Sequence, residues 1–167
     1  MHTQYLTEES LGKYLELLYP KYEIIHDKII PNSNCKFRPD FRIEELKLLV
    51  EFNGFHHFNS SSTILRDERK NKIYSDLGYK IINIPYFIQL DSTMLLYYFG
   101  YYPNDFPIST FPHGFISKVA LLPADFCELG IKSYNNILCK IPNKVFADIV
   151  QSLDNLVVNG KDSREVY

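Results

Sequence analysis

The chain has 167 residues, of which 46% are hydrophobic and 23% are charged, and its formal net charge is −2 at pH 7. These values are typical of one globular domain with a hydrophobic core. No run of about 18 apolar residues is present and the N-terminus resembles no signal peptide, so we expect neither a membrane span nor secretion. Three cysteines without CxxC spacing favour a reducing, cytoplasmic compartment and argue against a structural zinc site.

The first half of the chain predicts alternating helices and strands. Residues 7–19 predict a helix that begins at an N-cap threonine, and residues 22–30 predict a strand. A hairpin follows. Serines at 60–62 offer N-caps for a helix that runs to Leu77, and Gly78 stands where a C-terminal cap belongs. Residues 79–84 predict a strand, so the expected order is α-β-β-β-α-β.

The second half has a weaker pattern. Asp91 is the expected cap of a short helix that ends near residue 99, and two more helices are expected around residues 123–130 and 142–156. Residues 100–114 predict an ordered loop, and residues 159–167 predict a frayed tail. We therefore expect an α/β core over residues 1–88 and a mostly helical extension over residues 89–167 that packs on it as part of one compact unit.

The hairpin can be examined by its register. If Glu44 and Glu45 form a two-residue turn, then Ile43 faces Leu46 and Phe41 faces Leu48, and one face of the hairpin is wholly apolar. The opposite face carries the polar residues, which are Lys36, Arg38, Asp40, Arg42, Lys47, Glu51 and Asn53 together with Leu49. A longer loop with an odd register shift would break this arrangement.

Asp40 and Glu51 are diagonal neighbours in this register, with roughly 7–8 Å between their backbone positions. Two carboxylates at that spacing can share one divalent cation, and Mg²⁺ prefers such hard oxygen ligands, with Mn²⁺ as a possible substitute. The carbonyl of Phe52 is a natural third ligand. The alternative is a surface pair of acids, one of them neutralised by Arg38 opposite Glu51.

Four short motifs occur in order along the first half of the chain. They are Pro39-Asp40, the segment VEFNGFHHF at 50–58, RDERKN at 66–71 and GYKIINIPY at 78–86. With the expected element order, they resemble the PD-(D/E)XK nuclease superfamily, and more specifically its very-short-patch-repair-like and phage or homing endonuclease branch. The resemblance covers about residues 7–87 and implies a restriction-endonuclease-like core with a mixed sheet flanked by helices.

The resemblance implies roles for several residues. Asp40, Glu51 and Phe52 would hold the metal, and Glu8, which lies on the apolar stripe of the first helix, would touch it directly or through water. Its alternative role is to stabilise the helix N-terminus. Asn53 stands where the superfamily has a catalytic lysine, and it could only orient water.

In related branches of the superfamily, a lysine from the next helix can replace the catalytic lysine that is missing at position 53. Lys70 lies on the face of that helix expected to meet the sheet, so it is the expected substitute; alternatively its stem packs on the core and its ammonium lies in solvent. His57 matches the histidine of the motif and could contact phosphate or shuttle a proton, although a histidine in a polar loop often does neither.

The negative net charge does not favour nucleic-acid binding, but the basic residues are unevenly distributed. Arg38 and Arg42 lie on the polar face of the hairpin, and Arg66 and Arg69 lie just beyond it, so these four are the expected contacts to nucleic acid.

The resulting expectation is a Mg²⁺-dependent endonuclease that hydrolyses double-stranded DNA, of homing or restriction type, and a homodimer. A mismatch-repair nicking enzyme is an alternative within this class. A second class is a non-catalytic nucleic-acid-binding module that retains the fold, and a third is an interaction protein in which the charged cluster is a salt-bridge network.

Overall fold

A computed structural model of the chain describes residues 6–106 and 123–158. Among these residues the fold is α/β, with a four-stranded mixed sheet and six α-helices. The helices are α1 (Glu8–Leu18), α2 (His56–Asn59), α3 (Ser61–Asp76), α4 (Ser92–Phe99), α5 (Glu128–Leu138) and α6 (Asn143–Val158). The strands are β1 (Ile25–His26), β2 (Phe41–Ile43), β3 (Leu48–Asn53) and β4 (Lys80–Pro85).

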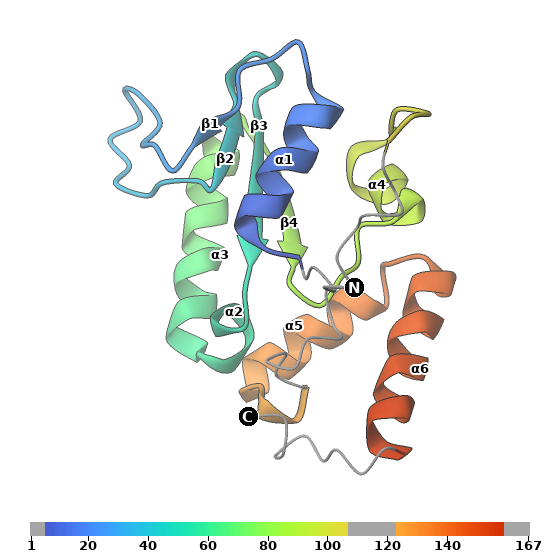
Figure 1. Ribbon diagram of the computed structural model, residues 1–167. Helices are drawn as coiled ribbons and strands as arrows, with labels where there is room; N and C mark the ends of the chain where they lie inside the picture. The colour runs from blue at the N-terminus through green and yellow to red at the C-terminus, as the bar shows by residue number, and fades with distance from the viewer. Residues whose placement is uncertain (1–5, 107–122, 159–167) are drawn as a thin grey trace.

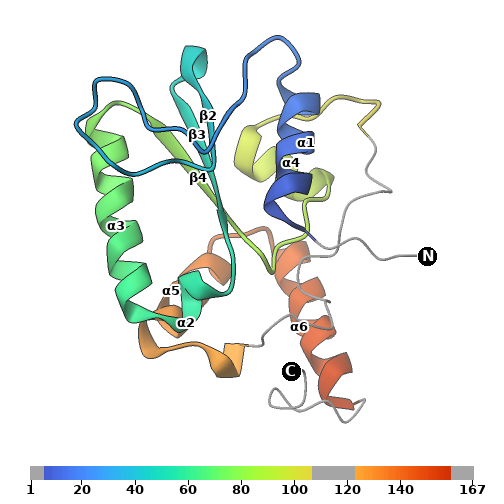
Figure 2. The same cartoon turned by 60° about the vertical axis from the view of Figure 1, so that its left-hand side comes forward.

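The strands lie in the order β1-β2-β3-β4. The first two pairs are antiparallel and β3 pairs with β4 in parallel. Parallel pairing needs a crossover connection, which α2 and α3 supply. Helix α3 lies on one side of the sheet, and α1 and α4 lie on the other (Figures 1 and 2). The expected α/β class and the alternation of elements up to β4 are confirmed.

Strand alternation divides the buried side chains between the two sides of the sheet. Leu48 and Val50 of β3 belong to a large hydrophobic cluster with the leucines of α1. Leu49, between them, belongs to a second, smaller cluster with Tyr74 of α3. The large cluster also includes residues of α4, α5 and α6, so the C-terminal helices share the core of the sheet.

The hairpin register differs from the predicted one by two residues. Phe41 pairs with Val50 and Ile43 with Leu48, because residues 44–46 form a 3₁₀ turn, η1, and Lys47 adopts a left-handed conformation with φ 46°. The turn is therefore four residues long rather than two. An even shift keeps every side chain on its predicted face, so the division into an apolar and a polar face is confirmed although the partners are wrong.

Local capping explains several helix ends. The Ser60 side chain accepts a hydrogen bond from the N–H of Thr63 at the start of α3, and Asp91 caps α4 in the same way through Met94. Gly78, which follows α3, has φ 84°, a conformation that residues with a Cβ rarely adopt. These three predicted signals are confirmed.

Other predicted bounds were wrong. The strand predicted over residues 22–30 is β1, two residues long, and Asp27 directly after it has φ 47°. The helix predicted at 123–130 is a 3₁₀ turn, η3 (Pro123–Asp125), followed by the separate helix α5. Helix α2 was not predicted. The predicted tail at 159–167 and the end of the loop predicted at 100–114 lie outside the described residues.

Candidate functional site

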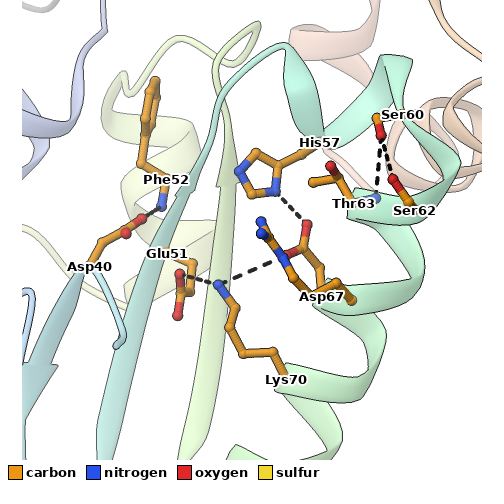
Figure 3. A network of polar contacts seen from close by, with 10 residues as sticks. Asp40, Glu51, Phe52, His57, Ser60, Ser62, Thr63, Asp67 and Lys70 are labelled. Carbon is orange, nitrogen blue, oxygen red and sulfur yellow. Dashed lines mark hydrogen bonds and ion pairs between the residues drawn. The ribbon is translucent and has the colours of Figure 1, made fainter. Parts of the chain in front are cut away.

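Part of the polar face of the hairpin is buried, although Lys36, Arg38 and Lys47 of that face are exposed. Glu51 of β3 points toward α3, where Lys70 and Asp67 extend to meet it (Figure 3). Glu51 and Arg42 are both buried. The sheet and α3 therefore enclose a polar network. Burial of charged groups is unusual, and it generally requires a partner of opposite charge or a hydrogen bond.

Lys70 and Glu51 form the centre of this network. Lys70 Nζ donates a hydrogen bond to Glu51 Oε2 at 2.8 Å, and the two side chains are 12% and 2% exposed. Burial raises the pKa of Glu51 to about 7, while the charge of Lys70 acts in the opposite direction. The other oxygen, Oε1, is buried and has no hydrogen-bond partner in the described structure. Lys70 therefore faces the sheet, as its helical phase indicated, and its catalytic role stays a prediction.

Asp40 lies beside this pair, at the end of the loop that enters β2. Its Oδ2 accepts a hydrogen bond from the backbone N–H of Phe52 at 2.7 Å (Figure 3). Burial raises the pKa of Asp40, and this hydrogen bond partly offsets the effect. The charge of Asp40 in turn contributes to the raised pKa of Glu51. The expected approach of the two carboxylates is thus present, and one Asp40 oxygen is held by the backbone.

Glu8, which was expected at the metal site, and His57, which was expected to contact phosphate or to shuttle a proton, have other partners. Glu8 Oε1 lies 2.6 Å from His26 Nε2, at the exposed N-terminal end of α1. His57 Nδ1 contacts Asp67 Oδ2, and Asp67 Oδ1 lies 4.0 Å from Lys70 Nζ. Within residues 6–106 and 123–158, no group of three or more His, Cys, Asp or Glu side chains is placed to hold a metal ion.

The four predicted basic contacts lie in different environments. Arg42 is 5% exposed and donates to Glu44 at 2.8 Å, so its prediction as a surface contact to nucleic acid was wrong. Arg38 is exposed and lies 3.3 Å from Asp27. Arg66 and Arg69 are exposed on α3, three residues apart and therefore on one side of the helix.

A polar cleft of about 600 Å³ opens where β3 and β4 end, between α3 and α5. Its lining includes asparagines from four elements, which are Asn53 of β3, Asn71 of α3, Asn83 of β4 and Asn136 of α5. His57 and Asp67 also line it, so the cleft continues from the buried network. Of these six residues, sequence analysis selected Asn53 and His57 as site residues.

The missed residues carried a usable signal. Asp67 and Asn71 are four residues apart on α3, in phase with the buried Tyr74, so helical periodicity places polar groups on the face that meets the sheet. Asn83 lies between the buried Ile82 and Ile84 of β4, so strand alternation places it on the opposite face of the sheet from them. Asn136 could not have been found, because the docking of α5 was not expected.

None of the helices in the described part is long and apolar enough to cross a lipid bilayer. The Mg²⁺ ion, the enzymatic activity, the double-stranded DNA partner and the homodimer stay predictions.

Comparison with known protein families corrects the predicted family. Residues 50–92, from β3 to the first residue of α4, match the model of the RAP domain, an RNA-binding domain family. No match to a PD-(D/E)XK family accompanies it, so the predicted nuclease family was wrong, and with it the assignment as a Mg²⁺-dependent DNA endonuclease of homing or restriction type. Comparisons with curated proteins and with solved structures find no match. The segment of this chain that can be related to a known family is thus residues 50–92, which are similar to a RAP domain.

Proposed function

We propose that this chain binds RNA through the surface formed by α3 and the adjoining end of the sheet. The observation that carries the proposal is the match of residues 50–92 to the RAP domain, an RNA-binding domain family. The matched segment is one contiguous unit in space, because it consists of β3, the crossover helices α2 and α3, and the parallel strand β4.

The exposed surface of this unit carries groups that attract phosphate. Arg66 and Arg69 are exposed on α3, and the Arg66 side chain is 61% exposed. A guanidinium offers several donors in a planar arrangement that suits phosphate oxygens. Lys132 is exposed on α5, which packs against α3. Lys132 is paired with Glu128 and Lys72 with Asp76, each at 2.9 Å, so we expect smaller contributions from these two lysines than from the arginines.

Because the net charge is −2, the attraction to RNA must come from a local group of cations and not from the charge of the whole chain. A few arginine contacts to phosphate give binding that weakens as salt rises, because each contact releases condensed counterions. Two lysines provide a comparison, Lys13 of α1 and Lys21 after this helix, because α1 lies on the opposite side of the sheet from α3 (Figure 2). They should contribute little to RNA affinity.

Fluorescence anisotropy with the full chain tests the proposal. Labelled single-stranded RNA, single-stranded DNA of the same sequence and duplex DNA are titrated at several salt concentrations. We expect RNA to bind most tightly. The double variant Arg66→Ala/Arg69→Ala should bind RNA more weakly and reduce the salt slope by about 1.4, or about 0.7 for each lost phosphate contact.

A variant that removes the same charge elsewhere serves as the control. Lys13→Ala/Lys21→Ala removes two exposed cations in and directly after α1, and it should leave the slope unchanged. Equal slopes in the two double variants would contradict the proposed surface. Equal affinity for RNA and DNA, or no binding of RNA, would contradict the proposed function.

A further inference from the structure

The asparagine-lined cleft is distinct from the arginine surface of α3. It lies at the ends of β3 and β4, and α5 closes one side with Asn136, Lys132 and Leu129. These three residues lie outside the segment similar to the RAP domain. The cleft therefore combines residues of the matched segment with a wall from α5, which lies outside that segment.

The lining combines apolar and charged residues with several side chains that both donate and accept hydrogen bonds. Each asparagine amide has one acceptor oxygen and two N–H donors, and four such amides converge from four elements. The Oδ1 atom of Asn71 is buried and has no hydrogen-bond partner in the described structure. Buried polar atoms nearly always have a partner, so the hydrogen bonding of this lining amide is incomplete.

The charges of the cleft disfavour a phosphate group. Asp67 and Glu68 contribute two carboxylates, and Lys132 contributes one ammonium that is already shared with Glu128 at 2.9 Å. A phosphate would meet more negative than positive charge. A neutral ligand with alternating donors and acceptors avoids that repulsion and can satisfy the amides.

A nucleobase has these properties. Asparagine pairs with the donor and acceptor edges of bases, most directly with N6 and N7 of adenine. Apolar side chains on the α5 side of the cleft, Leu129 and Ile137, provide contact for the face of a ring. The volume of about 600 Å³ lies within the range of about 300–1,000 Å³ that is usual for small-molecule sites.

The arginine surface and the cleft adjoin each other. Arg66 Nε lies 3.9 Å from Asp67 Oδ1, and Asp67 lines the cleft. A phosphate held at Arg66 would therefore place a neighbouring nucleotide at the mouth of the cleft. Sequence-specific RNA recognition commonly uses unstacked bases of single strands in this way.

We propose that the cleft between α3 and α5 binds one unstacked base of single-stranded RNA and that its asparagines select which base enters. This inference rests on the proposed function, because it names the part of the RNA that the same surface recognises. The arginines of α3 then supply affinity for phosphate, and the amides supply base preference.

Two neighbouring asparagines of α5 give a matched test. Asn136 lines the cleft and Asn135 does not, and both are exposed, so neither substitution should prevent folding. Asn136→Asp and Asn135→Asp add the same charge and replace the same amide. The full-length variants are titrated with short RNA homopolymers of A, C and U of equal length, and with an abasic ribose-phosphate oligomer of that length.

We expect the unmodified chain to discriminate among the homopolymers and to bind its preferred one about tenfold more tightly than the abasic oligomer. Asn136→Asp should change the ratio of dissociation constants between the preferred homopolymer and the others by about tenfold, which reduces or inverts the preference. Asn135→Asp should leave this ratio unchanged. Equal binding of all homopolymers and the abasic oligomer, or equal effects of the two variants, would overturn the base site and leave RNA binding intact. Failure to bind any oligomer would overturn the proposed function and the base site together.

Discussion

The ammonium of Lys70 and the carboxylate of Glu51 form an ion pair, with 2.8 Å between Nζ and Oε2, in the space between α3 and the sheet. Both side chains are largely removed from solvent, so each depends on the other to be accommodated there. Removing one member of a buried pair leaves an uncompensated charge. The pair therefore links the folding of α3 to the protonation of Glu51.

Replacing Lys70 with methionine should destabilise the fold at neutral and alkaline pH. Lys70→Met removes the cation and keeps an apolar side chain, so the ionised Glu51 loses its partner, at a cost of about 3–5 kcal/mol in the free energy of unfolding. Urea unfolding followed by circular dichroism at pH 8 measures this change. The double variant Glu51→Gln/Lys70→Met serves as the control and should recover most of the loss, because no ionised carboxylate remains at position 51. An equally large loss of unfolding free energy in the double variant would show that breaking the ion pair does not cause the loss.

The raised pKa of Glu51 predicts how stability depends on pH. Its ordinary value is 4.5 and burial raises it to about 7 in the folded chain, so the folded state binds more protons than the unfolded state between these values. The contribution to the free energy of unfolding is complete below pH 4.5 and is lost as pH rises through about 7. The loss attributable to Glu51 is about 3 kcal/mol.

Denaturant unfolding at a series of pH values from acid to mildly alkaline measures this slope. Glu51→Gln should flatten it, while Glu45→Gln, which changes an exposed carboxylate of the hairpin turn, should leave it unchanged. An identical slope in the unmodified chain and the Glu51→Gln variant would contradict the assignment. Burial also raises the pKa of Asp40, so a residual slope of the same sign is expected in Glu51→Gln.

Residue alternation explains why the sequence predicted one part of the site well. The alternation of residues 48–53 places Glu51 on the polar face, and a register shift of two residues does not change this. The position of Lys70 in the helical repeat places its side chain on the side of the helix that meets the sheet. What could not be predicted was the burial of Arg42 and Glu51 on that face. Arg42 was predicted as a surface contact because the hairpin alone does not show which of its polar residues are buried.

The cleft was harder to predict from the sequence than the Lys70–Glu51 pair, and the reason is physical. Its α5 wall is set by contacts between distant segments, such as the hydrogen bond from the Cys127 N–H to the Phe58 carbonyl at 3.1 Å. Helical periodicity identifies the apolar side of α5 but not the element that it packs against. The family itself was predicted wrongly because the four short motifs were individually unspecific, whereas the RAP match spans residues 50–92 continuously.

The docking of α5 depends on the absence of a side chain at Gly130. A Cβ there would lie 1.7 Å from the Phe58 carbonyl oxygen, which is backbone of α2 and cannot rotate away. Alanine favours a helix over glycine by about 1 kcal/mol, and overpacking typically costs about 1–3 kcal/mol or more. With an overlap this severe, we expect Gly130→Ala to destabilise the chain, and thermal unfolding should show a lower Tm.

Gly54→Ala is the matched control for this substitution. A Cβ at Gly54 would meet no atom within 4 Å, and its φ is not positive, so alanine should be tolerated. A Tm for Gly130→Ala equal to or above that of the unmodified chain would show that α5 does not approach α2 as described. Since α5 forms one wall of the cleft, Gly130→Ala should also weaken any base preference more than it weakens overall RNA affinity.

Arg42 should affect stability rather than RNA binding, in contrast to the arginines of α3. Its side chain is 5% exposed, and its guanidinium donates to Glu44, which also accepts a hydrogen bond from the Tyr79 hydroxyl. In Arg42→Met the partner Glu44, with a side chain 40% exposed, keeps access to water and to Lys47. The expected cost is therefore that of a charged hydrogen bond, about 1.5–3 kcal/mol, and not that of a stranded buried charge.

Urea unfolding and RNA titration of the same preparations separate the two roles of arginine. Arg42→Met should lower the free energy of unfolding and leave the RNA dissociation constant within about twofold under conditions where the variant is folded, because a twofold change is only about 0.4 kcal/mol. Arg69→Ala should show the reverse pattern, since its side chain is exposed. A loss of RNA affinity in Arg42→Met as large as that in Arg69→Ala would place Arg42 on the binding surface and would contradict its assignment to a purely structural role.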